Sequence, residues 1–179
     1  MTKEKKILSS TQIKTLITQF ARSILTGNNN PDSIALIGIH NRGIPLAQRL
    51  KIILEQKTKT NIPLGWVDIT LYRDDLETIG PAPLVKGTKI DFDLTNKNII
   101  LVDDVLFTGR TIRAAIDELI DFGRPRSIQL AALVDRGGRE LPIQPDYVGK
   151  TIKIKDNEII NVKLAETDGI DGVWVTRKK

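Results

Sequence analysis

The feature that most constrains the fold is one short stretch, residues 99–111, which reads IILVDDVLFTGRT. Its start, IILV, is a continuous apolar run typical of a fully buried strand. Its end, TGRT, leads into a helical pattern of apolar residues at Ile112, Ala115, Ile116, Leu119 and Ile120. A helix N-terminus offers free backbone amides to an anion, and Gly109 lets a ligand approach the backbone closely. The stretch therefore predicts a strand, an anion-binding turn and a helix, although two carboxylates, Asp103 and Asp104, stand in front of the turn.

Strand-like and helix-like segments alternate along the whole chain. Apolar runs or period-two alternation predict strands at 33–39, 67–72, 98–104 and 127–135. Apolar residues at helical spacing predict helices near 10–25, 46–54 and 112–120, the first of them capped by Ser9 or Ser10. This order predicts an α/β fold with a mostly parallel, twisted sheet flanked by helices. We expect a single domain, 1–179, with a small subdomain of short strands from about 136 to 179.

Composition excludes several kinds of site and location. The chain has no cysteine and one histidine, His40, so disulfides, thiolate metal sites and an ordinary zinc centre are excluded, and any metal should be bound by oxygen. The start, MTKEKKILSS, lacks the apolar core of a signal peptide, and no segment has membrane-spanning length, so we expect a cytoplasmic protein without membrane contact. A net charge of +5 is compatible with phosphorylated ligands or nucleic acid, but part of it lies in the tails KEKK and TRKK.

The two aspartates have a chemical explanation. Ligands of open parallel sheets bind beyond the carboxyl ends of the strands, which is where Asp103 and Asp104 are expected. A ligand with a phosphate, vicinal hydroxyls and a bound Mg²⁺ would use the turn and both carboxylates, so a sugar phosphate with magnesium fits. The alternative, solvated aspartates beside an ordinary helix cap, stays open on these residues alone. The nucleotide-kinase and dehydrogenase motifs GxxxxGK[ST] and GxGxxG are absent.

Beyond these patterns, the chain resembles a known family. IILVDDVLFTGRT resembles the phosphoribosyl pyrophosphate (PRPP) motif of type I phosphoribosyltransferases. Other segments resemble the PyrR family, whose members regulate the pyrimidine operon and are uracil phosphoribosyltransferases: LIGIHNRGIPLAQRL, DITLYRDDL, PLVKGTKI, GRPRSIQLAALVDRGGRELPI and DYVGK. The resemblance covers nearly the whole chain and becomes loose beyond about Lys155. It implies the type I phosphoribosyltransferase fold, in which the small subdomain is called the hood.

The resemblance implies that uracil and PRPP give UMP and pyrophosphate, a pentosyl transfer. Asp103 and Asp104 would bind the ribose hydroxyls, near a Mg²⁺ held mainly by PRPP. The motif residues that would bind PRPP or UMP with them are Val105, Leu106, Phe107, Thr108, Gly109, Arg110 and Thr111. The pyrophosphate loop would be Asn41, Arg42 and Gly43. The long loop after DITLY would close over PRPP with Arg73 as its cation, and uracil would be recognised near Val134, Asp135 and Arg136.

The family also binds RNA, a hairpin in the leader transcript of the pyrimidine operon, in response to UMP. The residues that match its RNA-binding positions are Thr18, Arg22, Arg139 and Lys150. Two departures bear on this role, because Arg22 stands where histidine is usual and Gln144 where arginine is usual. A polar helix face that is simply solvated explains Thr18 and Arg22 as well. The resemblance further implies a homo-oligomer, at least a dimer. A metabolite-sensing regulator with incidental turnover, and a phosphoribosyltransferase without RNA function, remain as alternatives.

Overall fold

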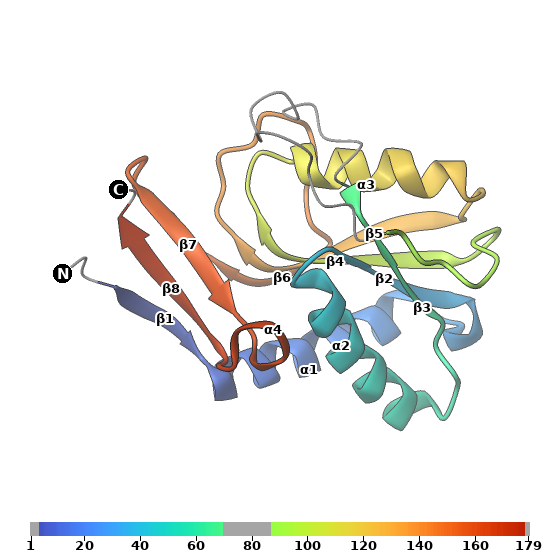
Figure 1. The fold of residues 1–179 in the computed structure, drawn as a ribbon. Coiled ribbons are helices and arrows are strands. Elements are labelled where there is room, and N and C mark those ends of the chain that lie inside the picture. Colours follow the sequence, from blue (N-terminus) through green and yellow to red (C-terminus); the bar gives the residue numbers. More distant parts are fainter. Residues whose placement is uncertain (1–3, 70–86, 178–179) are drawn as a thin grey trace.

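The computed structural model describes residues 4–69 and 87–177, and their main element is a five-stranded parallel sheet (Figure 1). The strands are β2 (Ile34–Ile39), β3 (Leu64–Val67), β4 (Asn98–Leu106), β5 (Ser127–Asp135) and β6 (Tyr147–Thr151). They lie in the order β3-β2-β4-β5-β6, and every neighbouring pair is parallel. The predicted α/β class with a mostly parallel sheet is confirmed, and β4, which carries the aspartates, lies at its centre.

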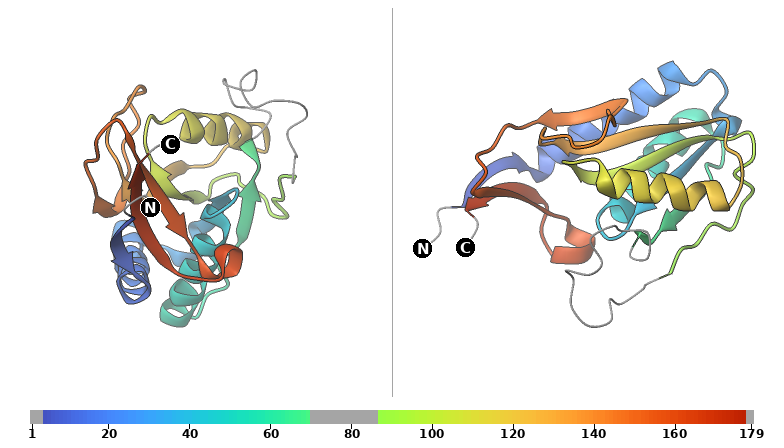
Figure 2. Two further views of the ribbon diagram at one scale, coloured as in Figure 1. Left: turned by 60° about the vertical axis from the view of Figure 1, so that its left-hand side comes forward. Right: turned by 90° about the horizontal axis from the view of Figure 1, so that it is seen from above.

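Helices cover both faces of this sheet (Figures 1 and 2). The helices α1 (Ser10–Gly27) and α2 (Gly43–Thr58) lie on one face, and α3 (Arg110–Asp121) lies on the other. Successive side chains of β4 point to opposite faces of the sheet and belong to two separate hydrophobic cores. Ile100 packs with α1 and α2, whereas Leu101 packs with α3. The buried side chains of α1 are Ile13, Ile17, Phe20, Ala21 and Ile24, as its helical period predicted. Its cap is Ser9, in a capping box with Gln12.

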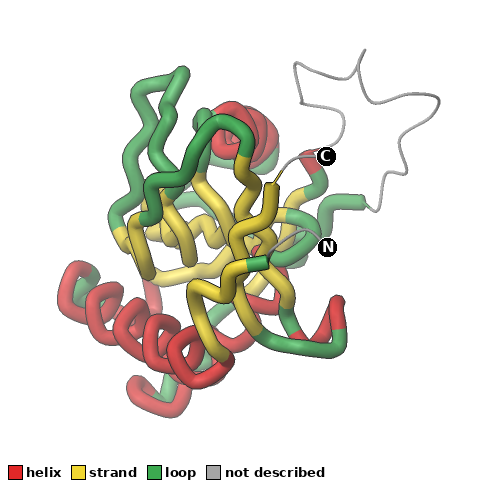
Figure 3. The backbone as a smooth tube through the Cα atoms, turned by 90° about the vertical axis from the view of Figure 1, so that its left-hand side faces the viewer, coloured by secondary structure: helices red, strands yellow, loops and turns green. Residues whose placement is uncertain are grey.

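A second, three-stranded antiparallel sheet forms the hood, which stands to one side of the main sheet (Figures 1 and 3). It contains β1 (Lys5–Ser9), β8 (Gly172–Arg177) and β7 (Glu158–Lys163) in that order, with the short helix α4 (Ala165–Asp168) between β7 and β8. The boundary expected near 136 differs from this arrangement, because β6 joins the main sheet and β1 joins the hood. Short strands show their period in the sequence but not their partners, which explains the difference.

The edge strand β3 corrects a second expectation. A strand was expected over 67–72, but β3 ends at Val67, and Asp68 and Ile69 leave the sheet. Its neighbour β2 ends at Ile39, which is the partner of Val67, so residues after Val67 have no strand to pair with. The rest of that segment lies outside the described residues. No helix in the described ranges is long and apolar enough to cross a membrane.

Candidate nucleotide-binding site

The two aspartates lie near the carboxyl end of the central strand β4. Asp103 is only 5% exposed, and its Oδ1 accepts a hydrogen bond from the backbone N–H of Asp104 at 2.9 Å. The Oδ1 of Asp104 accepts from the N–H of Val105 at 3.0 Å. Burial raises the pKa of Asp103 well above its ordinary value, and the neighbouring charge of Asp104 raises it further. Burial also raises the pKa of Asp104, although the positive charge of Arg42 opposes that shift.

Such a pair, one buried carboxylate and one half-buried carboxylate, fits ribose hydroxyls and a ligand-borne Mg²⁺. Ionised carboxylates need hydroxyl donors or a cation when water is scarce around them. In residues 4–69 and 87–177, no group of three or more His, Cys, Asp or Glu side chains is placed to hold a metal ion. The two aspartates could therefore supply only part of a coordination shell, which agrees with the tendency of Mg²⁺ to keep substrate oxygens and water as its other ligands.

The turn between β4 and α3 has the geometry expected of an anion site. Gly109 is the N-cap of α3 and adopts a left-handed conformation, with φ of 93°, that favours glycine. The N-cap residue itself makes no side-chain hydrogen bond to this helix. Backbone N–H groups in the first turn of a helix have no acceptor within the helix. The hydroxyl of Thr108 accepts one hydrogen bond from the N–H of Arg110 at 3.3 Å. The amides and the positive end of the α3 dipole can together bind a phosphate.

The turn HNRG lies beside these aspartates, between β2 and α2. Its last residue, Gly43, begins α2 and packs directly on the β4 backbone, where a methyl group would overlap the carbonyl oxygen of Val102. The peptide bond between His40 and Asn41 is cis. Gly43 therefore allows this turn to approach the strand immediately before Asp103.

We expect Gly43→Ala to displace the HNRG turn. The overlap is with backbone rather than with a flexible side chain, so relief requires movement of the turn or of β4. Overpacking of this kind costs about 1–3 kcal/mol, and the PRPP affinity should fall at the same time. Unfolding in urea and a PRPP titration measure both effects. Gly27→Ala is the control, because its methyl group would meet only the Tyr147 hydroxyl at 3.3 Å. If Gly43→Ala binds PRPP as tightly as wild type, the packing of Gly43 on β4 is not needed for PRPP binding.

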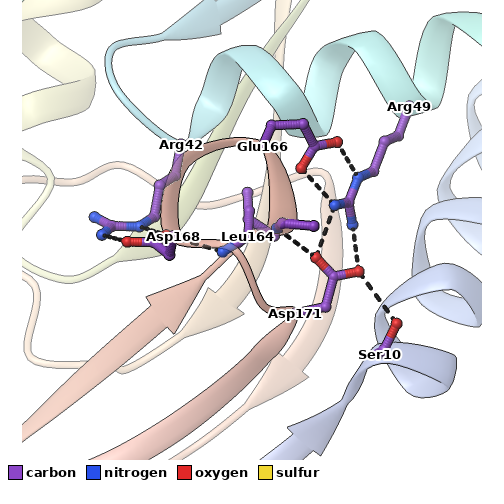
Figure 4. A network of polar contacts seen from close by, with 8 residues as sticks. Ser10, Arg42, Arg49, Leu164, Glu166, Asp168 and Asp171 are labelled. Carbon is purple, nitrogen blue, oxygen red and sulfur yellow. Dashed lines mark hydrogen bonds and ion pairs between the residues drawn. The ribbon is translucent and has the colours of Figure 1, made fainter.

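Arg42 makes an ion pair with the hood (Figure 4). Its Nε donates to Oδ2 of Asp168 at 3.1 Å, and its Nη2 donates to Oδ1 at 2.8 Å. The backbone N–H of Leu164 also donates to Oδ2 of Asp168. The pairing raises the pKa of Arg42 and lowers the pKa of Asp168. Asp168 was missed in the sequence, because an acid in an acidic turn (LAETDGID) resembles any solvated carboxylate.

A second arginine cluster fixes the hood to α2 and α1 (Figure 4). The guanidinium of Arg49 contacts Glu166 at 2.5 Å and Asp171 at 2.7 Å, and the Ser10 hydroxyl donates to Asp171 at 3.2 Å. Both carboxylates have lowered pKa values because of Arg49. The residues around α4 therefore contact both the start and the middle of α2, which itself begins at the HNRG turn.

The proposed uracil-binding residues lie next to the turn between β4 and α3. Asp135 is the ladder partner of Leu106, and the backbone N–H of Arg136 donates to the carbonyl of Leu106 at 2.9 Å. The Arg136 guanidinium lies 3.8 Å from the centroid of the Phe107 ring. Val134 is fully buried within β5. The structure thus brings the ends of β4 and β5 together, while Arg73 lies outside the described residues.

The four expected RNA-binding residues come from α1, from β6 and from the segment that follows β5. Thr18 is half-buried and Arg22 exposed on α1, which packs against the edge strand β6 that carries the exposed Lys150. Arg139 lies beside Asp135 and Phe107, with a side chain that is 13% exposed, and Asp135 is the ladder partner of Thr151, the residue after Lys150. Thr18 and Arg22 therefore lie on α1, Lys150 lies on the strand beside it, and Arg139 contacts the end of the strand β5 that pairs with β6.

A buried glutamate on α3 was also missed. Glu118 is buried, its Oε2 has no hydrogen-bond partner among the described residues, and burial raises its pKa. Its Oε1 accepts from the Thr88 hydroxyl, which in turn accepts from the backbone N–H of Asp68 at 2.9 Å. These contacts connect Asp68 and Thr88 to α3. The sequence gives no sign of these contacts, because a single glutamate in an amphipathic helix looks the same whether it is buried or solvated.

Comparisons with known proteins agree with this architecture. The phosphoribosyl transferase domain model matches residues 4–167. The chain is 53% identical over 167 residues to a protein named Bifunctional protein PyrR from Deinococcus deserti, covering 93% of this chain and 91% of that one. The chain belongs to the PyrR family of phosphoribosyltransferases. The PyrR protein of Acetivibrio thermocellus is 50% identical over 171 residues, covering 96% and 93% of the two chains.

Solved structures confirm the fold that the PyrR family shares with other phosphoribosyltransferases. A hypoxanthine-guanine phosphoribosyltransferase of Bacillus anthracis has a TM-score of 0.72 at 21% identity, covering 97% of this chain and 98% of that one. The hypoxanthine phosphoribosyltransferase of Trypanosoma cruzi has a TM-score of 0.74 at 20% identity, covering 97% and 95%. The predicted type I phosphoribosyltransferase fold is confirmed.

Proposed function

We propose that this member of the PyrR family is a uracil phosphoribosyltransferase, which converts uracil and PRPP into UMP and pyrophosphate. The observation that carries the proposal is the meeting of three segments at the carboxyl ends of the adjacent strands β2, β4 and β5. They are the HNRG turn, the aspartates with the phosphate-binding turn, and Asp135 with Arg136. These segments correspond to the three parts of the reaction: leaving pyrophosphate, ribose phosphate and base.

The chemistry divides among these segments. Transfer passes through a sugar with oxocarbenium character, so positive charge develops on the ribose and negative charge on the departing pyrophosphate. Asp103 and Asp104 hold the ribose hydroxyls and face the developing cation, while the α3 N-terminus holds the 5′-phosphate. Arg42 and the HNRG backbone stabilise the pyrophosphate. Mg²⁺, when bound with PRPP, neutralises pyrophosphate charge near the two aspartates.

A rate assay tests the enzymatic proposal. The protein should form UMP from uracil, PRPP and Mg²⁺ at a rate typical of enzymes, on the order of 1 per second or more. Hypoxanthine and guanine serve as competing bases, because the structural neighbours are purine enzymes. A rate far below this range would favour a metabolite-sensing regulator with incidental turnover, and preferred use of a purine would exclude the uracil assignment.

We further propose that UMP controls binding of the protein to the leader RNA of its pyrimidine operon. Family membership supports this proposal, and so does the exposed Arg22 on α1, which lies one turn from Thr18 and beside the strand of Lys150. Cationic side chains at such positions can contact RNA phosphates, and the chain has a pI of about 9.5. Low aromatic content, 4%, fits recognition by phosphate and edge contacts rather than by base stacking.

Lys150→Gln should weaken binding of the leader RNA and flatten its salt dependence. Each lost phosphate contact should reduce the log-log slope by about 0.7–0.9. Titrations of the leader hairpin and of a scrambled hairpin at two salt concentrations, with and without UMP, measure both. Lys57→Gln, which removes an exposed charge at the far end of α2, is the matched control. Arg22→His should be tolerated. If the wild-type protein binds the leader hairpin and the scrambled hairpin equally well, the proposal is wrong, and the protein is a phosphoribosyltransferase without RNA function.

We also propose a homo-oligomer, at least a dimer. Exposed apolar side chains support association, including Ile120 at 58% exposure and Phe122 at 48%, at the end of α3. Light scattering across a range of protein concentrations tests this proposal, and a constant monomeric mass would exclude it.

A further inference from the structure

The segment that follows β5 runs back along the phosphate-binding turn. The backbone N–H groups of Glu140 and Leu141 both donate to the carbonyl oxygen of Thr108, at 2.9 and 3.1 Å. Gly138 adopts a left-handed conformation, with φ of 77°, and a methyl group there would overlap the Phe107 ring. The Nε of Arg110 donates to Glu140 at 2.6 Å. The turn that would hold the 5′-phosphate is therefore packed against this segment rather than exposed on all sides.

Arg139 is the side chain that joins this segment to both parts of the site. Its Nε donates to the carbonyl of Ile143 at 2.8 Å, its Nη1 donates to the carbonyl of Phe107 at 2.9 Å, and its Nη2 lies 2.9 Å from Oδ1 of Asp135. The side chain is 13% exposed, and that of Asp135 is 15% exposed. All three guanidinium nitrogens thus have partners inside the protein. Three of its five N–H donors are thus used in these contacts.

The partners of Arg139 are informative because they belong to different parts of the site. Asp135 ends β5 on the side proposed to read uracil, and its Oδ1 also accepts the N–H of Gly137 at 2.8 Å. Phe107 begins the turn proposed to hold the 5′-phosphate. A planar guanidinium with donors in a fixed fork sets the spacing of its acceptors, which a lysine ammonium cannot do to the same degree.

We propose that Arg139 is a positioning residue for phosphoribosyl transfer, which fixes the base-reading end of β5 relative to the phosphate-binding turn. This inference rests on the proposed function. A nucleotide spans both places, with its base at Asp135 and its 5′-phosphate at the turn, so their separation decides whether the sugar carbon meets the base nitrogen. Misplacement by about 1 Å costs on the order of a hundredfold in rate.

The test compares Arg139→Gln and Arg139→Lys with Arg126→Gln in the full chain. Arg126 is an exposed arginine just before β5, at the opposite end of that strand from Asp135, so its replacement removes the same charge away from the site. Arg139→Gln should raise the KM for both PRPP and uracil and lower kcat/KM by at least about tenfold. Arg139→Lys should recover part of that loss, and Arg126→Gln should stay within about twofold of wild type. Far-ultraviolet circular dichroism and the melting temperature separate this effect from general unfolding.

Several outcomes decide the proposal. Wild-type kinetics in Arg139→Gln, together with weakened leader RNA binding, would overturn it and make Arg139 an RNA contact. Should Arg139→Gln fail to fold, Arg139→Lys carries the test, and unchanged KM values in that variant would overturn the proposal. If the wild-type protein forms no UMP, the proposed enzymatic function is wrong, and the proposal about Arg139 must be tested by binding instead. Calorimetric titration then measures the affinity of each variant for UMP. Arg139→Gln should lower this affinity by at least about tenfold, and an unchanged affinity would overturn the proposal.

Discussion

Replacing Asp103 with asparagine should lower UMP formation by at least about a hundredfold while leaving the ligand-free protein at least as stable as wild type. Removal of one electrostatic group aimed at transition-state charge typically costs 10²–10³ in kcat, on the order of 3–4 kcal/mol. Asparagine has nearly the same shape, and its side-chain oxygen can still accept the N–H of Asp104. Near wild-type turnover at saturating PRPP would show that Asp103 does not serve the ribose.

The stability of Asp103→Asn should depend on pH in a defined direction. Burial raises the pKa of Asp103 in the folded protein above the unfolded value of about 3.9. The folded state then binds a proton more tightly than the unfolded state, so this stabilising contribution is complete below the unfolded pKa and is lost as the pH rises through the folded pKa. The free energy of unfolding of the variant, minus that of wild type, should therefore increase with pH over this window.

Urea unfolding of the ligand-free proteins at several pH values measures this difference. Asp104→Asn is the matched control, because the positive charge of Arg42 opposes the effect of burial on the Asp104 pKa. The increase with pH in its free energy of unfolding, relative to wild type, should be smaller than for Asp103→Asn. A difference that decreases with pH in Asp103→Asn would contradict the raised pKa.

The second large effect is expected at the pyrophosphate end of the site. Arg42→Ala should weaken PRPP and pyrophosphate binding while leaving UMP affinity nearly unchanged, since UMP has no pyrophosphate. A hydrogen bond to a charged group contributes about 1.5–3 kcal/mol, which corresponds to roughly 10- to 150-fold in affinity. The variant also leaves Asp168 without its cation, and that unpaired charge repels the anion further. Calorimetric titrations with pyrophosphate and with UMP provide the comparison, and equal losses of both affinities would indicate a folding role instead.

Asp168→Asn should change the affinity for pyrophosphate in the opposite direction from Arg42→Ala. In the ligand-free protein, Asp168 occupies the donor fork of Arg42 and offsets its charge. Loss of this carboxylate should tighten pyrophosphate binding by a few fold, and Asp168→Asn should partly restore affinity to Arg42→Ala. Glu166→Gln is the control, because Glu166 lies on the same helix α4 but pairs with Arg49. Weaker pyrophosphate binding in Asp168→Asn would mean that the ion pair orients Arg42 rather than competing for it.

The sequence predicted the parts of this fold that depend on local pattern. Continuous apolar runs are typical of strands covered on both faces, so β2, β4 and β5 were found, and their parallel order followed from the helices between them. The pairing of β1 with β8 could not be predicted, because strand partners distant in sequence leave no mark in either strand. The same reason explains why β6 was placed in the hood rather than at the edge of the main sheet.

For the site, the motif residues could be predicted and their protein partners could not. Asp103, Asp104 and Gly109 lie where the strand-turn-helix pattern placed them. Asp168 and the buried contacts of Arg139 arise from segments that the fold brings together, and charged residues in polar stretches look alike whether they are solvated or paired. The resemblance assigned Arg139 to RNA, which stays a prediction, and the fold adds its contacts with Phe107 and Asp135.

The pairing of β1 with β8 has a consequence for the order of folding. Ser10, directly after β1, bonds to Asp171, directly before β8, across 161 positions of the sequence. During synthesis from the N-terminus, every strand of the main sheet leaves the ribosome before β8 does, and contacts between such distant segments carry a large entropic cost of loop closure. The hood is therefore completed last. Until then Arg42 lacks the carboxylate that holds it, so a newly made chain can assemble its central sheet before the side chain of Arg42 is fixed in place.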